Sequence, residues 1–511
     1  MIISLSVLVI TIIVSGTYAL YKTQLSKNIG VNTTTHGLAY YINYVKGTDI
    51  TAATLNPSTS YEGGASSDIE FWKKDDSYDI YGKIELTVNT IGTNLSNSPA
   101  LKYAVVNNGN VLKEGSLKGT TSGSKVTILK NLYLEQTKQI YTVYVWLDNS
   151  EELGNISNES LSISVDCTAS LQKEPTAADY ITDLYTEAAK VTATNNSITY
   201  NTAPSVSLMN DRLGGTTTDL DGGNIRYYGA NPNNYIYFNC SDYSNQTSST
   251  CETWRIIGVF DGKLKLIKSE SIGAYSWDNK DTSTGAENDT GKNDWTTARL
   301  MKLLNPSNYY KVDSNDNNLG QSLYYNSASG KCYSGQNNAT VDCDFTSTGI
   351  KNAETRNMIA ETTYNLGGWN SNSVYSNQIY EYERGTTVYS GRPTTWKGKI
   401  ALAYPSDYGY AADLNQCKDK TLYDYDNRTC TSNNWMKAII TNNGSNTGWL
   451  LTPRSGSSSN AWYVNSGGFV SRDSIAYVAY GAVPVLSLSS ELGIESGAGD
   501  GSSSKPYKLS A

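Results

Sequence analysis

The stretch Trp254-Arg-Ile-Ile-Gly-Val-Phe-Asp-Gly-Lys-Leu-Lys-Leu-Ile267 decides the architecture of the larger part of this chain. Two runs of mainly aliphatic and aromatic residues flank the dipeptide Asp261-Gly262. Asp-Gly is a preferred two-residue connection between antiparallel strands, because both residues tolerate the positive φ angles of a tight hairpin turn. The stretch therefore predicts a β-hairpin, and we expect further strands just before it, at Ile225–Gly229 and Tyr235–Cys240.

Helical stretches and then short β segments follow the hairpin. Stop signals predict helices over Thr296–Leu304, before Pro306, and over Glu354–Leu366, before Gly367. A third short helix is expected at Asn434–Thr441. The expected late strands are Trp449–Thr452, Trp462–Val464, Gly468–Val470, Ile475–Tyr480 and Val483–Leu488. This order predicts an α+β domain over residues 201–511.

Residues 30–168 show a different pattern, an alternation of apolar and polar side chains. Ile84, Leu86 and Val88 point one way while the residues between them are polar, as in a half-buried strand. The expected strands are Gly37–Val45, Tyr78–Ile91, Leu101–Val111, Lys125–Leu134, Ile140–Leu147 and Leu161–Cys167. Short strands separated by Asn, Gly and Ser turns predict an all-β sandwich.

Residues 169–200 are expected to connect the two domains. Apolar residues at helical spacing follow Pro175 and predict a helix over Lys173–Ala193, bounded by the Asn195-Asn196 break. We interpret it as the first helix of the C-terminal domain. A solvated spacer is the alternative.

Six of the seven cysteines form three closely spaced pairs, Cys240/Cys251, Cys332/Cys343 and Cys417/Cys430. Turn-forming residues flank each pair, so we expect three local disulfides, each contributing ~3 kcal/mol by restricting the unfolded chain. Unpaired thiols or metal ligands are the alternatives, but zinc sites favour closer cysteines or cysteine with histidine. Disulfides persist in oxidising compartments, which predicts an extracytoplasmic protein. Cys167 is left over, either as a small buried side chain or as a free or intermolecular thiol.

The N-terminal residues 1–24 are expected to form a signal or anchor helix. Ile2–Tyr21 is mostly apolar and uncharged, and is long enough to span a membrane. The small residues Ser15-Gly16-Thr17-Tyr18-Ala19 favour cleavage of a signal peptide instead. A buried core strand is a third alternative. The cysteine pairs, rather than the charges around this segment, place the rest of the chain outside the cytoplasm.

Composition limits the classes of partner. A chain of 511 residues is too long to fold around one hydrophobic core, so several domains are expected. A net charge of −8 and the lack of a Lys/Arg-rich run argue against binding of nucleic acid, since nothing would neutralise its phosphates. Tyrosine, with 40 residues, and asparagine are typical of adaptable binding surfaces, although tyrosine also serves strands.

The N-terminal motif carries a family resemblance. The apolar segment ends in Gly16-Thr17-Tyr18-Ala19-Leu20-Tyr21 and leads directly into the predicted sandwich. In this it resembles the camelysin/TasA class of bacterial surface and matrix-fibre proteins. The resemblance implies attachment to a cell surface and fibre building by strand exchange.

A second resemblance covers about 300 C-terminal residues. It rests on Trp254-Arg-Ile-Ile-Gly-Val, Asn293-Asp-Trp295, Gly448-Trp-Leu-Leu-Thr-Pro453, Ala461-Trp-Tyr-Val-Asn-Ser-Gly-Gly468 and Gly481-Ala-Val-Pro-Val-Leu-Ser-Leu488. These motifs resemble a bacterial domain family of unknown function that is similar to the C-type-lectin/formylglycine-generating-enzyme fold. Thr452 and Val483 replace the family's usual Ser and Arg. The cysteines are better explained as disulfides than as an active pair, so the fold resemblance transfers no catalytic activity.

Catalytic and metal chemistry have little support. The only histidine, His36, lies in the predicted sandwich, so His-dependent nucleophilic sites cannot be built in the C-terminal domain. Asp407 with Glu381 or Glu383 leaves glycoside hydrolysis open. The loops Asp278–Asp289 and Asp313–Asn318 offer oxygen ligands for calcium, but neither matches an EF-hand. We expect solvated loops, no metal and no cofactor.

With catalysis and metal binding little supported, ligand binding is the remaining class of function. In C-type-lectin-like folds the exposed face comprises the late loops and final β segments, here Trp449–Tyr480. The candidate ligand-binding residues are Tyr463, Asn465, Phe469, Arg472, Asp473, Tyr477 and Tyr480. Aromatic and Arg side chains anchor interfaces, and flat rings stack on sugars. The alternative is that Tyr463 and Tyr477 are core residues, which is what we expect of Trp449 and Trp462.

The sequence as a whole predicts a bacterial cell-surface adhesin, secreted or membrane-anchored, that binds an unknown surface protein or glycan without catalysis. One alternative is a TasA-like or pilin-like fibre subunit whose assembly needs residues 22–40. The other is a carbohydrate-active hydrolase with two carboxylates in a pocket.

Overall fold

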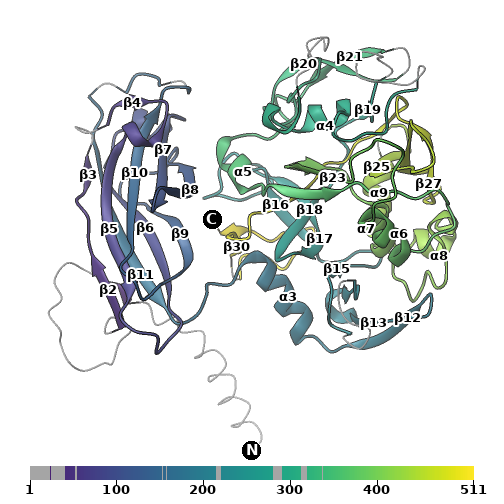
Figure 1. Ribbon diagram of the computed structural model, residues 1–511, viewed down its shortest axis with the longest axis horizontal. Helices are drawn as coiled ribbons and strands as arrows, with labels where there is room; N and C mark the ends of the chain where they lie inside the picture. The colour runs from purple at the N-terminus through teal and green to yellow at the C-terminus, as the bar shows by residue number, and fades with distance from the viewer. Residues whose placement is uncertain are drawn as a thin grey trace, which may run out of the picture. The chain divides into compact units, whose positions relative to one another are not determined.

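The computed structural model describes residues 23–24, 41–51, 55–151, 153–156, 158–213, 220–279, 290–311, 319–335, 338–442, 444–495 and 497–510. The chain divides into two compact units, Met1–Glu174 and Pro175–Ala511, and both are mainly β (Figure 1). The expected connecting segment 169–200 is thus divided, since its last 26 residues belong to the larger unit. Apart from Thr23–Gln24, the expected anchor helix lies outside the described residues. Within the described part of the chain, no helix has the length and apolar character needed to span a bilayer.

Two sheets form the first unit, the sandwich domain. One has the order β1-β11-β6-β9, with β3 beside β11, and the other has the order β2-β5-β10-β7-β8, with β4 beside β10. All pairs are antiparallel except β4 with β10. The bounds are β1 Thr23–Gln24, β2 Ile42–Val45, β3 Ile50–Thr51, β4 Pro57–Ser58, η3 Tyr61–Gly63, β5 Ala65–Lys73, β6 Tyr81–Ile91, α2 Thr93–Asn97, β7 Leu101–Asn107, β8 Asn110–Ser116, β9 Lys125–Tyr133, β10 Ile140–Asp148 and β11 Leu161–Ser170.

The two sheets bury one common core. Ile84, Leu86 and Val88 of β6 are fully buried in the same cluster as Val143 and Val145 of β10. Their alternation along each strand places every second side chain between the sheets. The sandwich and the inward face of β6 are therefore as predicted.

One predicted strand of this domain is wrong in extent. Leu101–Val111 is two strands, β7 and β8, because Asn108 and Gly109 adopt φ angles of 49° and 76° and form a tight hairpin turn. A central strand, Ala65–Lys73, was not expected at all.

The larger domain is built on a nine-stranded sheet. Its order is β12-β13-β14-β15-β17-β18-β29-β24, with β16 beside β17. The bounds are β12 Val191–Asn195, β13 Ile198–Ala203, β14 Leu208–Asn210, β15 Ile225–Tyr227, β16 Tyr235–Phe238, β17 Glu252–Phe260, β18 Lys263–Lys268, β24 Ile400–Ala401 and β29 Val485–Ser487.

The hairpin β17–β18 lies within this sheet and has the predicted turn at Asp261 and Gly262, with φ angles of 48° and 69°. Trp254 and Leu266 pack into one hydrophobic cluster, whereas Ile257 and Ile267 pack into another. Both faces of the hairpin are covered, which explains why its sequence is nearly continuously apolar.

A five-stranded sheet carries the late motifs. Its order is β19-β28-β25-β26-β27, and β25 lies beside α7 and α9 (Figure 1). Its bounds are β19 Ala274–Ser276, β25 Gly448–Pro453, β26 Asn460–Val464, β27 Val470–Ile475 and β28 Ala479–Gly481. The described residues of the domain also form three two-stranded sheets: β20 Ser329–Tyr333 with β21 Thr340–Asp344, β22 Thr362–Asn365 with β23 Thr395–Gly398, and β30 Gly493–Ile494 with β31 Leu509–Ser510.

The helices are short, and three are shorter than predicted by several residues. Thr296–Leu304 is helical only over Arg299–Leu304, because Thr296 N donates to Asp294 Oδ1 in a turn before the helix. Glu354–Leu366 comprises α5 and then β22, because Thr362, Thr363 and Tyr364 favour a strand and pair with β23. Lys173–Ala193 contains α3, which begins after a capping box of Thr176 and Asp179, and ends before β12. The bounds are α3 Ala177–Glu187, η4 Pro204–Val206, α4 Arg299–Leu304, η6 Ser307–Tyr309, α5 Ala353–Met358, α6 Ser376–Glu383, α7 Pro405–Tyr410, η7 Leu422–Asp424, α8 Arg428–Thr431 and α9 Trp435–Thr441.

Candidate functional site

The candidate residues lie on β26, β27 and β28 and on the turns between them, and we call this surface the β26–β28 face. On β25 and β26, Trp449 and Trp462 are only 1% and 0% exposed, so both tryptophans are core residues, each in a different hydrophobic cluster. Of the seven candidate side chains, Asp473 is exposed and the other six are partly exposed. None of them is a fully buried core residue.

Two of the candidate tyrosines are brought together over a buried tryptophan. The ring of Tyr480 lies 4.8 Å from Trp449 and 5.5 Å from Tyr463, measured between centroids. Burial raises the pKa of Tyr463, and Tyr480, Asp473 and Tyr423 add to this effect. Tyr480, Asp473 and Tyr423 are therefore each within electrostatic reach of Tyr463.

Asn465 and Phe469 lie at a tight turn between β26 and β27. The Asn465 side-chain Oδ1 accepts a hydrogen bond from Gly467 N at 2.9 Å, and the Asn465 backbone N donates to Phe469 O at 2.9 Å. Part of the Asn465 amide thus fixes the turn. Phe469 lies 5.3 Å from the ring of Tyr423, which is 48% exposed and was not among the candidates.

Arg472 and Asp473 belong to a charged cluster. Asp473 Oδ1 accepts from Arg454 Nη1 at 2.6 Å and also from Arg472 Nη1. Asn370 accepts from Arg454 Nε at 2.7 Å. The backbone N of Arg472 donates to Asn372 Oδ1 at 3.2 Å. Arg454 and the two asparagines were missed by sequence reasoning, and both asparagines come from a loop about a hundred residues earlier.

The same loop supplies one ring of an aromatic pair, and α6 supplies the other. Trp369 and Tyr382 are stacked with centroids 3.7 Å apart and planes at 7°, and both are partly exposed. Trp369 lies beside Arg454 in an isolated parallel bridge. The last candidate, Tyr477, lies in the turn before β28, and its carbonyl accepts from Ser276 Oγ at 2.7 Å.

Of the three carboxylates considered for hydrolysis, Asp407 and Glu383 are in the interior, whereas Glu381 is exposed. Asp407 Oδ1 accepts from Arg226 Nη1 at 3.1 Å, and its Oδ2 accepts from Lys265 Nζ. Glu383 accepts from Ser406 N at 2.9 Å and from Ser406 Oγ at 2.5 Å. Asp407 and Glu383 are 2% and 0% exposed, so a sugar cannot reach this pair.

The calcium loops are largely outside the described residues, including all of Asp313–Asn318. Asp278 is described and buried, and its carboxylate accepts from Lys292 N at 2.8 Å and from Arg299 N at 3.3 Å. The described residues contain no group of three or more His, Cys, Asp or Glu side chains that could hold a metal ion.

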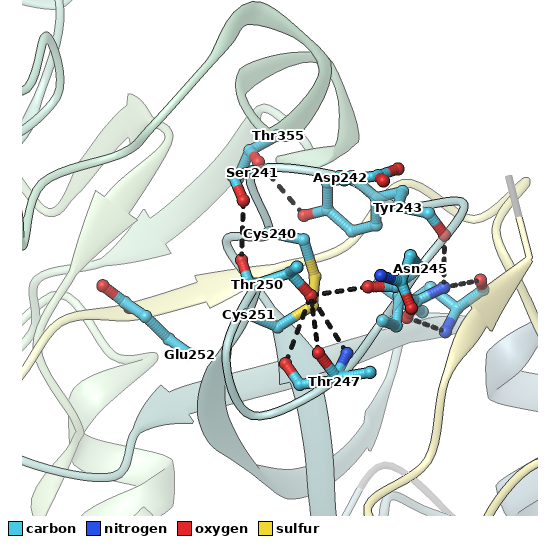
Figure 2. The surroundings of a disulfide bond; sticks show 12 residues. Cys240, Ser241, Asp242, Tyr243, Asn245, Thr247, Thr250, Cys251, Glu252 and Thr355 are labelled. Atoms are coloured by element: carbon cyan, nitrogen blue, oxygen red, sulfur yellow. Dashed lines mark hydrogen bonds between the residues drawn. A yellow bond between two sulfur atoms is a disulfide. The ribbon is translucent and has the colours of Figure 1, made fainter. Parts of the chain in front are cut away.

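The three predicted disulfides are all present, Cys240–Cys251, Cys332–Cys343 and Cys417–Cys430. They indicate an oxidising, extracytoplasmic environment. Figure 2 shows the first one, which closes a loop whose interior is hydrogen-bonded: Thr250 Oγ1 donates to Asn245 O at 2.5 Å and accepts from Thr247 N at 3.0 Å. Cys167 is a free, buried thiol.

Comparison with known proteins gives little. No family model and no curated protein matches the chain. Two solved HCR/D variants align with 11% and 12% identity and a TM-score of 0.14, covering 50% of this chain and 76% of theirs. The receptor-binding domain of a botulinum neurotoxin mosaic serotype C/D aligns with 11% identity and a TM-score of 0.15, covering 52% of this chain and 75% of that one. Likenesses this weak carry no argument about fold or function.

Proposed function

We propose that this chain is an extracytoplasmic binding protein whose larger domain holds a surface protein or glycan on the β26–β28 face. The observation that supports the proposal is the exposure of the candidate side chains: their aromatic rings and arginines stay partly exposed, although Trp449 and Trp462 of the same sheet are buried. Side chains of these types supply most of the binding energy in protein interfaces.

The face is pre-organised. Tyr480 is held between Trp449 and Tyr463, and Arg454 and Arg472 are held by a shared carboxylate. Side chains that are already ordered lose little rotamer entropy when a ligand binds, so more of the contact energy appears as affinity.

The rest of the chain fits presentation of such a face. The disulfides fix loops of the larger domain, and the N-terminal segment 1–24 would attach the chain to a membrane or direct its secretion. In this proposal the protein is a bacterial adhesin with a C-type-lectin-like binding domain and a sandwich stalk. The fibre alternative depends on residues 22–40, almost all of which lie outside the described residues.

The test is an array of glycans and surface proteins probed with the full chain. Tyr480→Ala and Tyr463→Ala should lower binding of any captured ligand by about tenfold or more, since aromatic anchors commonly contribute over 1 kcal/mol each. Tyr78→Ala is the matched control, because Tyr78 is an exposed tyrosine of the sandwich domain. Binding that survives both tyrosine substitutions, or no captured ligand at all, would overturn the proposal.

A further inference from the structure

The β26–β28 face carries a local excess of positive charge. Arg454 and Arg472 form ion pairs with one and the same carboxylate, Asp473. Two guanidinium groups against one carboxylate leave a charge of about +1 at this point, in a chain whose net charge is −8. We call Arg454 and Arg472 the arginine pair.

The arginine pair has N–H groups that donate no hydrogen bond within the described residues. Arg454 uses Nε on Asn370 and Nη1 on Asp473, and Arg472 uses Nη1 on Asp473. Among the described residues, neither Nη2 makes a hydrogen bond, and Arg472 Nε is buried with no acceptor. The two side chains are 24% and 19% exposed, so the guanidinium groups are partly desolvated yet reachable. A partly desolvated cation with unused donors favours an anionic acceptor.

The surroundings favour a sugar over a peptide. Trp369, from the loop that also supplies Asn370, stacks flat on Tyr382 of α6, and aromatic faces of this kind pack against sugar rings. Ser455 N donates to Trp369 O at 3.4 Å, and Ser455 begins a loop of four serines and one glycine, Ser455–Ser459, which leads to Asn460 at the start of β26. Small hydroxyl and amide groups suit the hydroxyl groups of a sugar.

We propose that the ligand of the β26–β28 face is an acidic glycan, whose sugar carboxylate binds across the arginine pair while a neighbouring ring packs on Trp369. This inference rests on the proposed function and names the ligand class of the same site. Asp473 is the positioning residue, since it holds both guanidinium groups in place beside the incoming carboxylate. Charge-assisted hydrogen bonds from the two Nη2 groups to the carboxylate oxygens supply the selectivity for an anion.

The experiment measures binding of the full chain to two uronic-acid oligosaccharides, hyaluronan and oligogalacturonate, and to their carboxyl-reduced counterparts. At least one acidic oligosaccharide should bind, and its reduced form should bind about tenfold more weakly or less, the loss expected for one charge-assisted pair. Arg472→Gln and Arg454→Gln should each reproduce that loss, and the affinity should fall as salt rises. Lys505→Gln is the control, because it removes one positive charge from an exposed side chain of the C-terminal segment.

Three results would overturn the inference. The first is equal binding of the acidic and reduced forms, and the second is binding that ignores both arginine substitutions. The third is binding of sulfated glycans or of polyglutamate that matches the uronic acids, which would mean that charge alone is recognised. Loss of binding in Tyr480→Ala with no effect in the arginine variants would refute the acidic glycan while leaving the proposed function standing.

Discussion

The side-chain amide of Gln246 hydrogen-bonds both backbone groups of Leu509: its Nε2 donates to Leu509 O at 2.7 Å, and Leu509 N donates to its Oε1 at 2.9 Å. Gln246 lies in the loop closed by Cys240–Cys251, and Leu509 begins β31. The first disulfide loop therefore fixes the C-terminal strand of the larger domain, in addition to closing itself.

Gln246→Ala should release this strand. The substitution leaves two backbone groups of Leu509 without partners in a buried setting, which costs about 1–3 kcal/mol. Faster hydrogen exchange of the Leu509 amide, together with a lower unfolding midpoint, is the expected result. Gln416→Ala changes an exposed glutamine and should alter neither quantity. Unchanged exchange at Leu509 in Gln246→Ala would contradict the assignment.

Thiol chemistry should distinguish Cys167 from the other six cysteines. Cys167 is fully buried in the sandwich core, and burial raises the pKa of its thiol well above the usual value. A thiol reagent should find no reactive cysteine in the native protein at pH 8 and one after denaturation without reductant. Cys167→Ser should abolish that single signal. More than one reactive thiol in the denatured chain would mean that one of the three disulfides does not form.

The sequence predicted those features whose cause is local. The hairpin at Asp261-Gly262 and the three disulfides each depend on residues within a few positions of one another, so spacing was sufficient. The strand β5 was missed because two of its five inward positions, Ser67 and Lys73, are polar and break the alternation.

Much of the candidate site depends on the fold and was not visible in sequence. Arg454 hydrogen-bonds to Asp473, which lies 19 residues later in the chain, and to Asn370, which lies 84 residues earlier. Nothing near Arg454 in the chain signals either contact, because sheet pairing and a long loop bring them together. Trp369 gave no signal either, since its stacking on Tyr382 depends on where α6 packs.

The buried pair of Lys265 with Asp407 should matter far more than the exposed pair of Arg454 with Asp473. Removing the Asp407 carboxylate by Asp407→Asn leaves Lys265 as an uncompensated cation in the interior, while Arg226 keeps its ion pair with Asp211, and the loss costs about 3–5 kcal/mol. Asp473→Asn, at an exposed carboxylate, should cost below about 1 kcal/mol. Urea denaturation of the two variants measures the difference. Equal destabilisation would show that the interior network is not a structural one.

Glu383 should make stability depend on pH. Burial raises its pKa from 4.5 to about 7, an effect that Arg384 and Ser406 only partly oppose and that Asp407 reinforces. Because the folded state holds the proton more tightly than the unfolded chain, the stability associated with neutral Glu383 is complete below about pH 4.5. This stability, about 3 kcal/mol in total, is lost as the pH rises towards 7 and is absent above pH 7.

The variant Glu383→Gln tests this origin, because it keeps an uncharged group of the same shape. The free energy of unfolding of Glu383→Gln relative to wild type should increase by about 2–3 kcal/mol between pH 5 and pH 8. Glu381→Gln, on the exposed side of the same helix, should follow the wild-type profile. Parallel pH profiles of Glu383→Gln and wild type, measured by denaturant unfolding, would rule out this origin of the pH dependence.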